Sequence, residues 1–205
     1  EGGVSIALVD AITEDDLARV AEAFHAHPFV TGGSGLAMHL PKFWDARRAP
    51  EQEAQPLGGP ALILSGSCSA ATLAQLEQLR ASGTVVLPYT VSAVEAEAVL
   101  ASDGHVAIAS SAAPDARTPG VEREIELHMG EWARHFVRER GVRRVIVAGG
   151  ETSGAVVEAL GVRAVELTGI LDPGVPSLRT LDAAPIALAL KSGNFGSVDF
   201  FQKAM

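Results

Sequence analysis

Cysteine is nearly absent from this chain of 205 residues, in which Cys68 is the only one. One cysteine excludes an internal disulfide framework and any zinc site built from several cysteines, and it fits a reducing compartment. Aromatic residues are also scarce, at 5%. No apolar run reaches the length of a membrane span, and the first residues have neither the basic start nor the long apolar stretch of a signal peptide. We therefore expect a soluble, cytoplasmic protein.

Positively charged residues are also few compared with negatively charged ones. Lysine and arginine number 16 against 25 aspartate and glutamate residues, which gives a formal net charge of −9. An acidic chain is not attracted to nucleic acid or to an anionic membrane, so neither is expected as a partner. The six histidines show no metal-binding spacing, and we predict no metal site built from protein ligands alone. Apolar residues, at 47%, suffice for a sizeable core.

Short apolar, β-branched runs alternate along the chain with segments of helical period. This alternation predicts βαβ units, and therefore an α/β fold with a mostly parallel sheet and helices on both faces. The predicted strands are residues 6–9, 29–31, 61–64, 85–88, 106–109, 144–148, 164–167 and 186–190.

Helices are predicted between these strands. Thr13 and Asp16 form a capping-box pattern ahead of an apolar face that includes Leu17 and Phe24, and Ser92 with Glu95 forms a second box. Pro119 suits the first position of a longer helix. The buried stripe of that longer helix is predicted to be Ile125, Met129, Trp132 and Phe136.

Residues 41–60 interrupt the pattern with several prolines and glycines and no helical or strand period, which predicts a linker. The chain also starts without Met, and residues 5–10 already have the pattern of a strand in the middle of a domain. We expect a piece of a longer protein, with a short part before the linker and a larger part, residues 61–205, after it.

Four loops rich in glycine and small hydroxyl residues follow predicted strands. Glycine lets the backbone approach a ligand closely, hydroxyl groups add donors, and the start of a following helix favours phosphate. Any one of them alone is more simply a tight turn between strand and helix, whereas four together favour a phosphate or nucleotide site. The loops are residues 31–35 (TGGSG), 65–69 (SGSCS), 149–154 (GGETSG) and 192–196 (SGNFG).

None of the common phosphate or nucleophile fingerprints is present, so a nucleotide site here is of another design. Single candidates are less specific. Glu151 either caps a helix or contacts a ribose, a metal ion or a base. Lys191 either reaches a phosphate or ends its strand in water. Cys68 lacks a nearby histidine for a nucleophilic role, and residues 172–176 (DPGVP) are predicted to form a rigid turn.

These motifs together closely resemble the four-carbon acid sugar kinase family. The resemblance is carried by residues 149–157 (GGETSGAVV), 172–176, and 189–196 (ALKSGNFG) followed by Asp199-Phe200-Phe201, with residues 31–37 and 65–69 matching in the same order. Within the family the GGETSG form is most similar to the 3-oxo-tetronate kinases, and the D-threonate and D-erythronate kinases are close alternatives.

The resemblance implies two α/β domains, the first for the acid sugar and the second for ATP with Mg²⁺. It implies that residues 1–40 are the tail of the acid-sugar domain, 41–60 the linker and 61–205 the nucleotide-binding domain. It also implies phosphorylation of the C4 hydroxyl of 3-oxo-tetronate. The residues implied to contact the nucleotide are Ser65, Gly66, Ser67, Ser69, Gly149, Gly150, Glu151, Thr152 and Gly193.

Several points stay open from sequence. The Asp-rich motif that opens full-length family members has no counterpart in this chain, and no catalytic base is assigned. A nucleotide-binding module without activity of its own is the main alternative. An α/β enzyme that acts on a phosphorylated metabolite is a further one, and a homo-oligomer is compatible with either.

Overall fold

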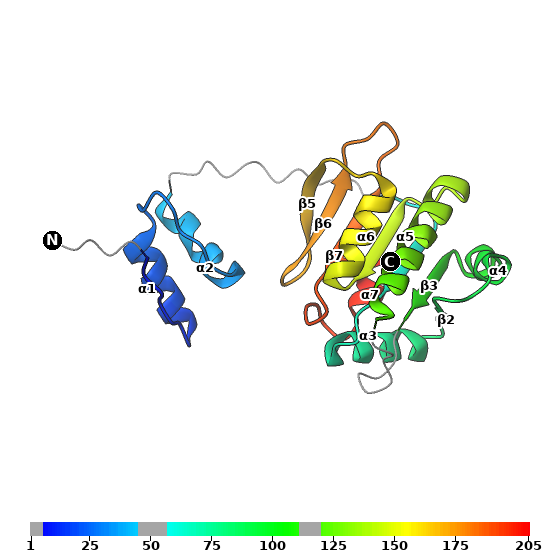
Figure 1. Cartoon of the computed structure of the whole chain (residues 1–205), viewed down its shortest axis with the longest axis horizontal. Helices are drawn as coiled ribbons and strands as arrows, with labels where there is room; N and C mark the ends of the chain where they lie inside the picture. The colour runs from blue at the N-terminus through cyan, green and yellow to red at the C-terminus, as the bar shows by residue number, and fades with distance from the viewer. Residues whose placement is uncertain (1–5, 45–56, 111–119) are drawn as a thin grey trace. The chain divides into compact units, whose positions relative to one another are not determined.

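The computed structural model describes residues 6–44, 57–110 and 120–205, which form two compact units, Glu1–Glu51 and Gln52–Met205 (Figure 1). The first unit contains α1 (Glu14–Phe24), α2 (Ser34–His39) and a 3-10 turn, η1 (Leu40–Phe43). Thr13 caps α1 in the predicted capping box with Asp16. The buried core of this unit is small and consists of Ala21, Leu36 and Leu40.

Two predicted strands of the first unit are wrong. Residues 6–9 and 29–31 have no regular structure, and Leu8 and Phe29 are 97% and 80% exposed. A strand is stable only beside a hydrogen-bonded neighbour, and no other strand lies within the described part of this unit. The glycine loop at residues 31–35 therefore does not follow a strand, although α2 begins inside it.

The second unit is a seven-stranded sheet in the order β2-β3-β1-β4-β7-β6-β5. The first five strands in that order are parallel, and β6 and β5 add an antiparallel edge, so the prediction of a mostly parallel sheet is confirmed. The strands are β1 (Ala61–Ser65), β2 (Val86–Pro88), β3 (His105–Ala109), β4 (Arg144–Ala148), β5 (Val165–Asp172), β6 (Val175–Thr180) and β7 (Ala187–Lys191).

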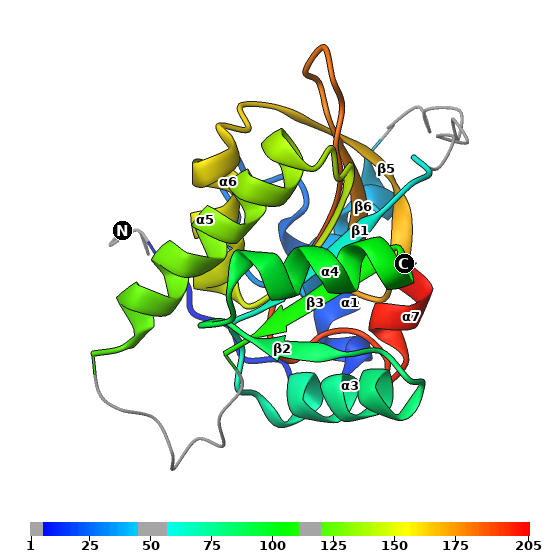
Figure 2. The same ribbon diagram turned by 90° about the vertical axis from the view of Figure 1, so that its right-hand side faces the viewer.

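Helices cover both faces of this sheet, as predicted (Figures 1 and 2). Alternate residues of a strand point to opposite faces, so Leu62 and Leu64 of β1 pack with one set of helices and Ile63 with the other. One face is covered by α4 (Ala93–Asp103), α5 (Glu122–Glu139) and α6 (Gly150–Leu160), and the other by α3 (Ala70–Ala81) and α7 (Phe200–Ala204).

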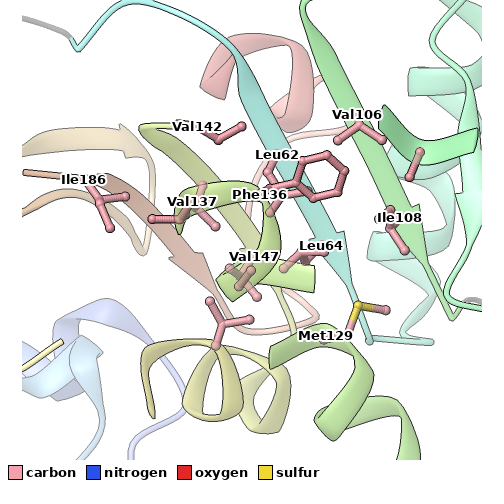
Figure 3. Packing of buried hydrophobic residues seen from close by; sticks show 14 of the residues in the cluster. Leu62, Leu64, Val106, Ile108, Met129, Phe136, Val137, Val142, Val147 and Ile186 are labelled. Atoms are coloured by element: carbon pink, nitrogen blue, oxygen red, sulfur yellow. The ribbon is translucent and has the colours of Figure 1, made fainter. Parts of the chain in front are cut away.

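The larger cluster lies beneath α5 (Figure 3). Met129 and Phe136 are fully buried there, and Ile125 and Trp132 are partly buried against the same cluster, which matches the predicted stripe. The helix itself begins at Glu122, and the predicted start at Pro119 lies outside the described residues. No helix in the described ranges of the chain is long and apolar enough to cross a membrane.

The predicted rigid turn at residues 172–176 is shorter than expected. Its central residues Pro173 and Gly174 join β5 to β6, and the strand predicted at residues 164–167 runs on to Asp172. The linker prediction covers η1 at its start, and residues 45–56 of it lie outside the described residues.

The strand order creates a switch point between β1 and β4. From β1 the chain crosses to β2 and β3 on one side, and it then crosses to β4 on the other. In open α/β sheets a ligand crevice lies at the carboxyl ends of the strands at this position. The register aligns the last residues of β1, β4 and β7, namely Ser65, Ala148 and Lys191, so three glycine-rich loops leave the sheet at one level.

Candidate functional site

A pocket of about 710 Å³ lies where these three loops meet. The loop after β1, the start of α6 after β4, and the loop after β7 all line it, together with the first turns of α5. Every residue predicted to contact a nucleotide lines this pocket except Ser65. The lining residues are Gly66, Ser67, Cys68, Ser69, Val121, Glu122, Ile125, Glu126, Gly149, Gly150, Glu151, Thr152, Ser192 and Gly193.

Ser65 is the last residue of β1 and is fully buried. Its carbonyl accepts the Ser110 N–H at 2.9 Å, and its hydroxyl has no hydrogen-bond partner among the described residues. Ser65 therefore differs from the other predicted site residues, because it ends the strand behind the pocket and does not line it.

Glycine is required at two of the pocket positions by close approach. A Cβ at Gly66 would overlap the Oγ1 of Thr152, and one at Gly193 would overlap the Oγ of Ser67. Gly149 has a φ of +125°, a conformation that only glycine adopts without strain. At Gly66 and Gly193 the loop backbone therefore packs directly against a side chain, with no room for a larger residue.

Gly150 is different, because a Cβ there would meet nothing within 4 Å. It is exposed and is the first residue of α6. The N–H groups of the first helical turn have no carbonyl partner within their helix, and the helix dipole adds partial positive charge at this end. Residues 150–152 of α6 therefore offer donors to an anion in the pocket.

A second helix also begins at the pocket. Ser69 is the N-cap of α3, and its hydroxyl accepts the Thr72 N–H at 3.2 Å. The Ser69 hydroxyl also donates to the Gly193 carbonyl at 2.5 Å, and the Thr72 hydroxyl donates to the same oxygen at 2.8 Å. The loop after β7 is therefore fixed directly to the start of α3.

Lys191 is buried beneath this loop, with 2% of its surface exposed. Of the two roles left open by the sequence, an ending of the strand in water is wrong. Its Nζ donates to Thr72 Oγ1 at 3.0 Å and to the carbonyls of Ser192 and Gly193, both at 3.1 Å. Burial lowers the pKa of Lys191 to about 8, because the charged form loses contact with water.

The rest of the loop is held by two buried polar side chains. Gln75 Nε2 of α3 lies within 3.0–3.1 Å of the carbonyls of residues 195, 196 and 197. The Asp172 carboxylate accepts the Ser197 N–H at 2.8 Å and its hydroxyl at 2.6 Å, and these hydrogen bonds lower the pKa of Asp172. The two motifs that stand apart in the sequence, residues 172–176 and 192–196, are thus brought together.

Sequence reasoning missed the contribution of α5. The apolar period of this helix predicts the residues that it buries, but it does not predict which residues face the pocket. Those that line the pocket are Val121, Glu122, Ile125 and Glu126. Cys68 also lines the pocket, at 9% exposure. The carboxylates at the pocket are those of Glu122, Glu126 and Glu151, from two helices.

Most of the histidines make ordinary contacts, and the exception is His105, whose Nε2 is buried without a hydrogen-bond partner among the described residues. His135 Nε2 lies 2.8 Å from Glu97, and His128 Nδ1 lies 2.8 Å from the carbonyl of Glu124. Both line a second, smaller hollow of about 320 Å³ with Tyr89 and Trp132. No group of three or more histidine, cysteine, aspartate or glutamate residues within the described ranges is arranged to hold a metal ion.

The glycine loops at a switch point and the paired helix starts are features of an α/β nucleotide-binding domain. Residues 62–201 match the model of the family described as "Nucleotide-binding C-terminal domain", and the chain belongs to this family.

Among curated proteins, the chain is 41% identical to the 3-oxo-tetronate kinase of Burkholderia multivorans and 41% identical to that of Cupriavidus necator. Each match covers 99% of this chain and 52% of the relative, so the chain spans about half the length of the curated relatives it matches. A crystal structure of a Salmonella typhimurium LT2 protein superposes with a TM-score of 0.74 at 34% identity, over 95% of this chain and 51% of that one.

Proposed function

We propose that this chain is the nucleotide-binding part of an ATP-dependent kinase that phosphorylates the C4 hydroxyl of 3-oxo-tetronate. The observation that carries the proposal is the convergence of three glycine and hydroxyl loops with the starts of α3 and α6 on one pocket. The names of the curated relatives support the choice of acid sugar.

The nucleotide phosphates would be held by the chain's own donors. Phosphoryl transfer depends mainly on positioning and on neutralising charge, and little covalent chemistry falls to the protein. The backbone N–H groups of Gly150 and Gly193 are proposed to bind phosphate oxygens, and the hydroxyls of Ser67 and Thr152 to add hydrogen bonds. The Gly149 N–H is not available to a phosphate, because it donates to the Lys191 carbonyl at 2.9 Å. The general base that takes the proton from the sugar hydroxyl is not assigned.

The donor set also fits Mg²⁺ arriving with ATP. Magnesium is usually held by one or two carboxylates together with substrate phosphates, and it does not need a cage made of protein ligands alone. Glu151 lines the pocket from the first turn of α6 and is the proposed carboxylate, acting through water. When bound, the ion supplies positive charge that neutralises the phosphates.

The proposal is tested first by the substitution Gly150→Val. Gly150 lines the pocket and an added Cβ there would meet nothing within 4 Å, so we expect the fold to tolerate the change and the pocket to lose space for the nucleotide. The expected result is at least a tenfold loss of Mg²⁺-ATP affinity in calorimetric titration, with an unchanged circular dichroism spectrum. The matched control is Gly154→Val, because Gly154 lies in the same helix, also has free space, and does not line the pocket. Equal affinity of both variants and the wild type would contradict the placement of the nucleotide.

The substrate is tested by phosphorylation assays of the same chain with 3-oxo-tetronate, D-threonate and D-erythronate. Preferred turnover of 3-oxo-tetronate supports the proposal, and preferred turnover of either other acid would replace it with one of the related kinases.

A nucleotide-binding module without activity of its own is the second candidate. The observation that favours it is the family model, which matches residues 62–201 and is described as a nucleotide-binding domain. Saturable Mg²⁺-ATP binding without turnover of any of the three acids would select this candidate. A homo-oligomer also stays a prediction, which light scattering on the purified chain would check.

A further inference from the structure

We infer that Lys191 is a positioning residue for the phosphate end of the nucleotide. Its ammonium group holds two loop carbonyls inward and thereby turns the N–H groups of Gly193 and Asn194 outward as an anion-binding pair. The inference rests on the proposed function, because it takes the ligand of the pocket to be a nucleotide.

The first observation is how the three donors of the ammonium group are used. They go to Thr72 Oγ1 and to the carbonyls of Ser192 and Gly193, at 3.0–3.1 Å. The Gly193 carbonyl also accepts hydrogen bonds from the hydroxyls of Ser69 and Thr72. Both loop carbonyls are thus fixed toward Lys191.

The second observation follows from peptide geometry. In a trans peptide the carbonyl and the N–H point in opposite directions, so the Gly193 and Asn194 N–H groups point away from the ammonium group. Neither N–H has a hydrogen-bond partner among the described residues. The segment is a turn closed by the Phe195 N–H on the Ser192 carbonyl at 3.2 Å, and successive N–H groups in a turn form a concave anion site. Gly193 lines the pocket.

The third observation is the electrostatic setting of Lys191. The side chains in contact with its ammonium are Thr72 of α3 and the Phe200 ring of α7, which lies 6.0 Å from Nζ, and neither carries charge. In the part of the chain that the structure describes, no carboxylate forms an ion pair with Lys191. A phosphate on the other side of the loop would be the nearest partner for this buried cation.

The consequence is a proton linkage. The lone ammonium is partly deprotonated near pH 8, and an anion beside it favours the charged form, so nucleotide binding should take up protons. At pH 8 we expect an uptake of up to about half a proton per nucleotide bound. We also expect affinity to fall as the pH rises above 8, because the free chain then loses the positive charge.

The experiment is calorimetric titration of the full chain with Mg²⁺-ATP from pH 7 to 9.5, in two buffers of different ionisation enthalpy. It compares the wild type with Lys191→Met, which replaces the ammonium by an apolar group of similar length. The matched control is Arg80→Met, which removes a cation from α3 at the end that is away from the pocket.

The inference is supported if Lys191→Met binds at least tenfold more weakly at pH 7, takes up no protons and shows a flat pH profile, while Arg80→Met resembles the wild type. It is overturned if Lys191→Met keeps the wild-type affinity and pH profile, and the proposed function then stands. If Lys191→Met does not fold, the wild type alone decides, because a binding reaction without proton uptake at pH 8 overturns the inference. A folded wild-type chain that binds no Mg²⁺-ATP at any pH overturns both.

Discussion

At the scale of single residues, the pocket depends on places where the backbone needs the smallest side chain. Gly66→Ala should lower stability by about 1–3 kcal/mol, because the added Cβ would overlap Thr152 Oγ1 in a well-packed region. Chemical denaturation measures the loss. The double variant Gly66→Ala with Thr152→Ala should lose less than the sum of the two single changes, since the overlapping oxygen is gone. Strict additivity would show that the overlap is relieved in another way.

The sequence alone predicts some of the residues at the pocket and leaves the location of others open. Gly150, Glu151 and Ser67 could be predicted because they belong to short runs of glycine and hydroxyl residues between a strand and a helix, a pattern typical of phosphate-binding loops. The location of Lys191 could not be decided, because the same residue at a strand end is solvated or buried depending on what α3 and α7 place above it. The motif predicts Ser65 at the site together with its neighbours in sequence, yet strand pairing keeps Ser65 behind the pocket.

At the scale of elements, the hairpin of β5 and β6 is fixed to the loop after β7 through Asp172. Asp172→Asn should cost about 1–3 kcal/mol at pH 7, because hydrogen bonds from Ser197 to a charged acceptor are weakened. These bonds lower the pKa of Asp172 in the folded chain, so the stabilisation is present above the unfolded pKa and is lost as the pH falls through the folded one.

Urea unfolding from pH 7 to pH 3 measures both effects. At the acid end of this range the wild type should have the same free energy of unfolding as Asp172→Asn, because its carboxylate is then protonated. The control is Asp182→Asn, an exposed aspartate for which we expect little change at any pH. A constant gap between wild type and Asp172→Asn across the whole pH range would contradict the assigned role of the carboxylate.

Strands can be predicted from the sequence where the local apolar pattern agrees with the contacts that the strand makes in the fold. The parallel strands β1, β3 and β4 have continuous apolar runs because both of their faces are covered. β6 was missed because Pro173 and Pro176 suggest a turn, and only pairing with β5 and β7 shows a strand at residue 175 onward. Residues 6–9 show the reverse case, in which an apolar run without a neighbouring strand stays irregular.

At the scale of the whole molecule, the two units differ greatly in the size of their cores. The first unit buries Ala21, Leu36 and Leu40, whereas the second buries two extended clusters on both faces of its sheet. Because local stability follows buried apolar contact, amide hydrogens of α1 should exchange much faster than those of β1, β3 and β4. Hydrogen exchange with mass spectrometry would resolve this, and equal protection in both units would contradict it.

The crowded carbonyl of Gly193 has a spectroscopic consequence. Hydrogen bonds withdraw electron density from a C=O bond and lower its stretching frequency, and this oxygen accepts from Ser69, Thr72 and Lys191 together. A ¹³C label on glycine carbonyls should therefore give Gly193 an infrared band displaced from those of solvent-exposed glycines. The frequency of that band should therefore change whenever Lys191 gains or loses its proton.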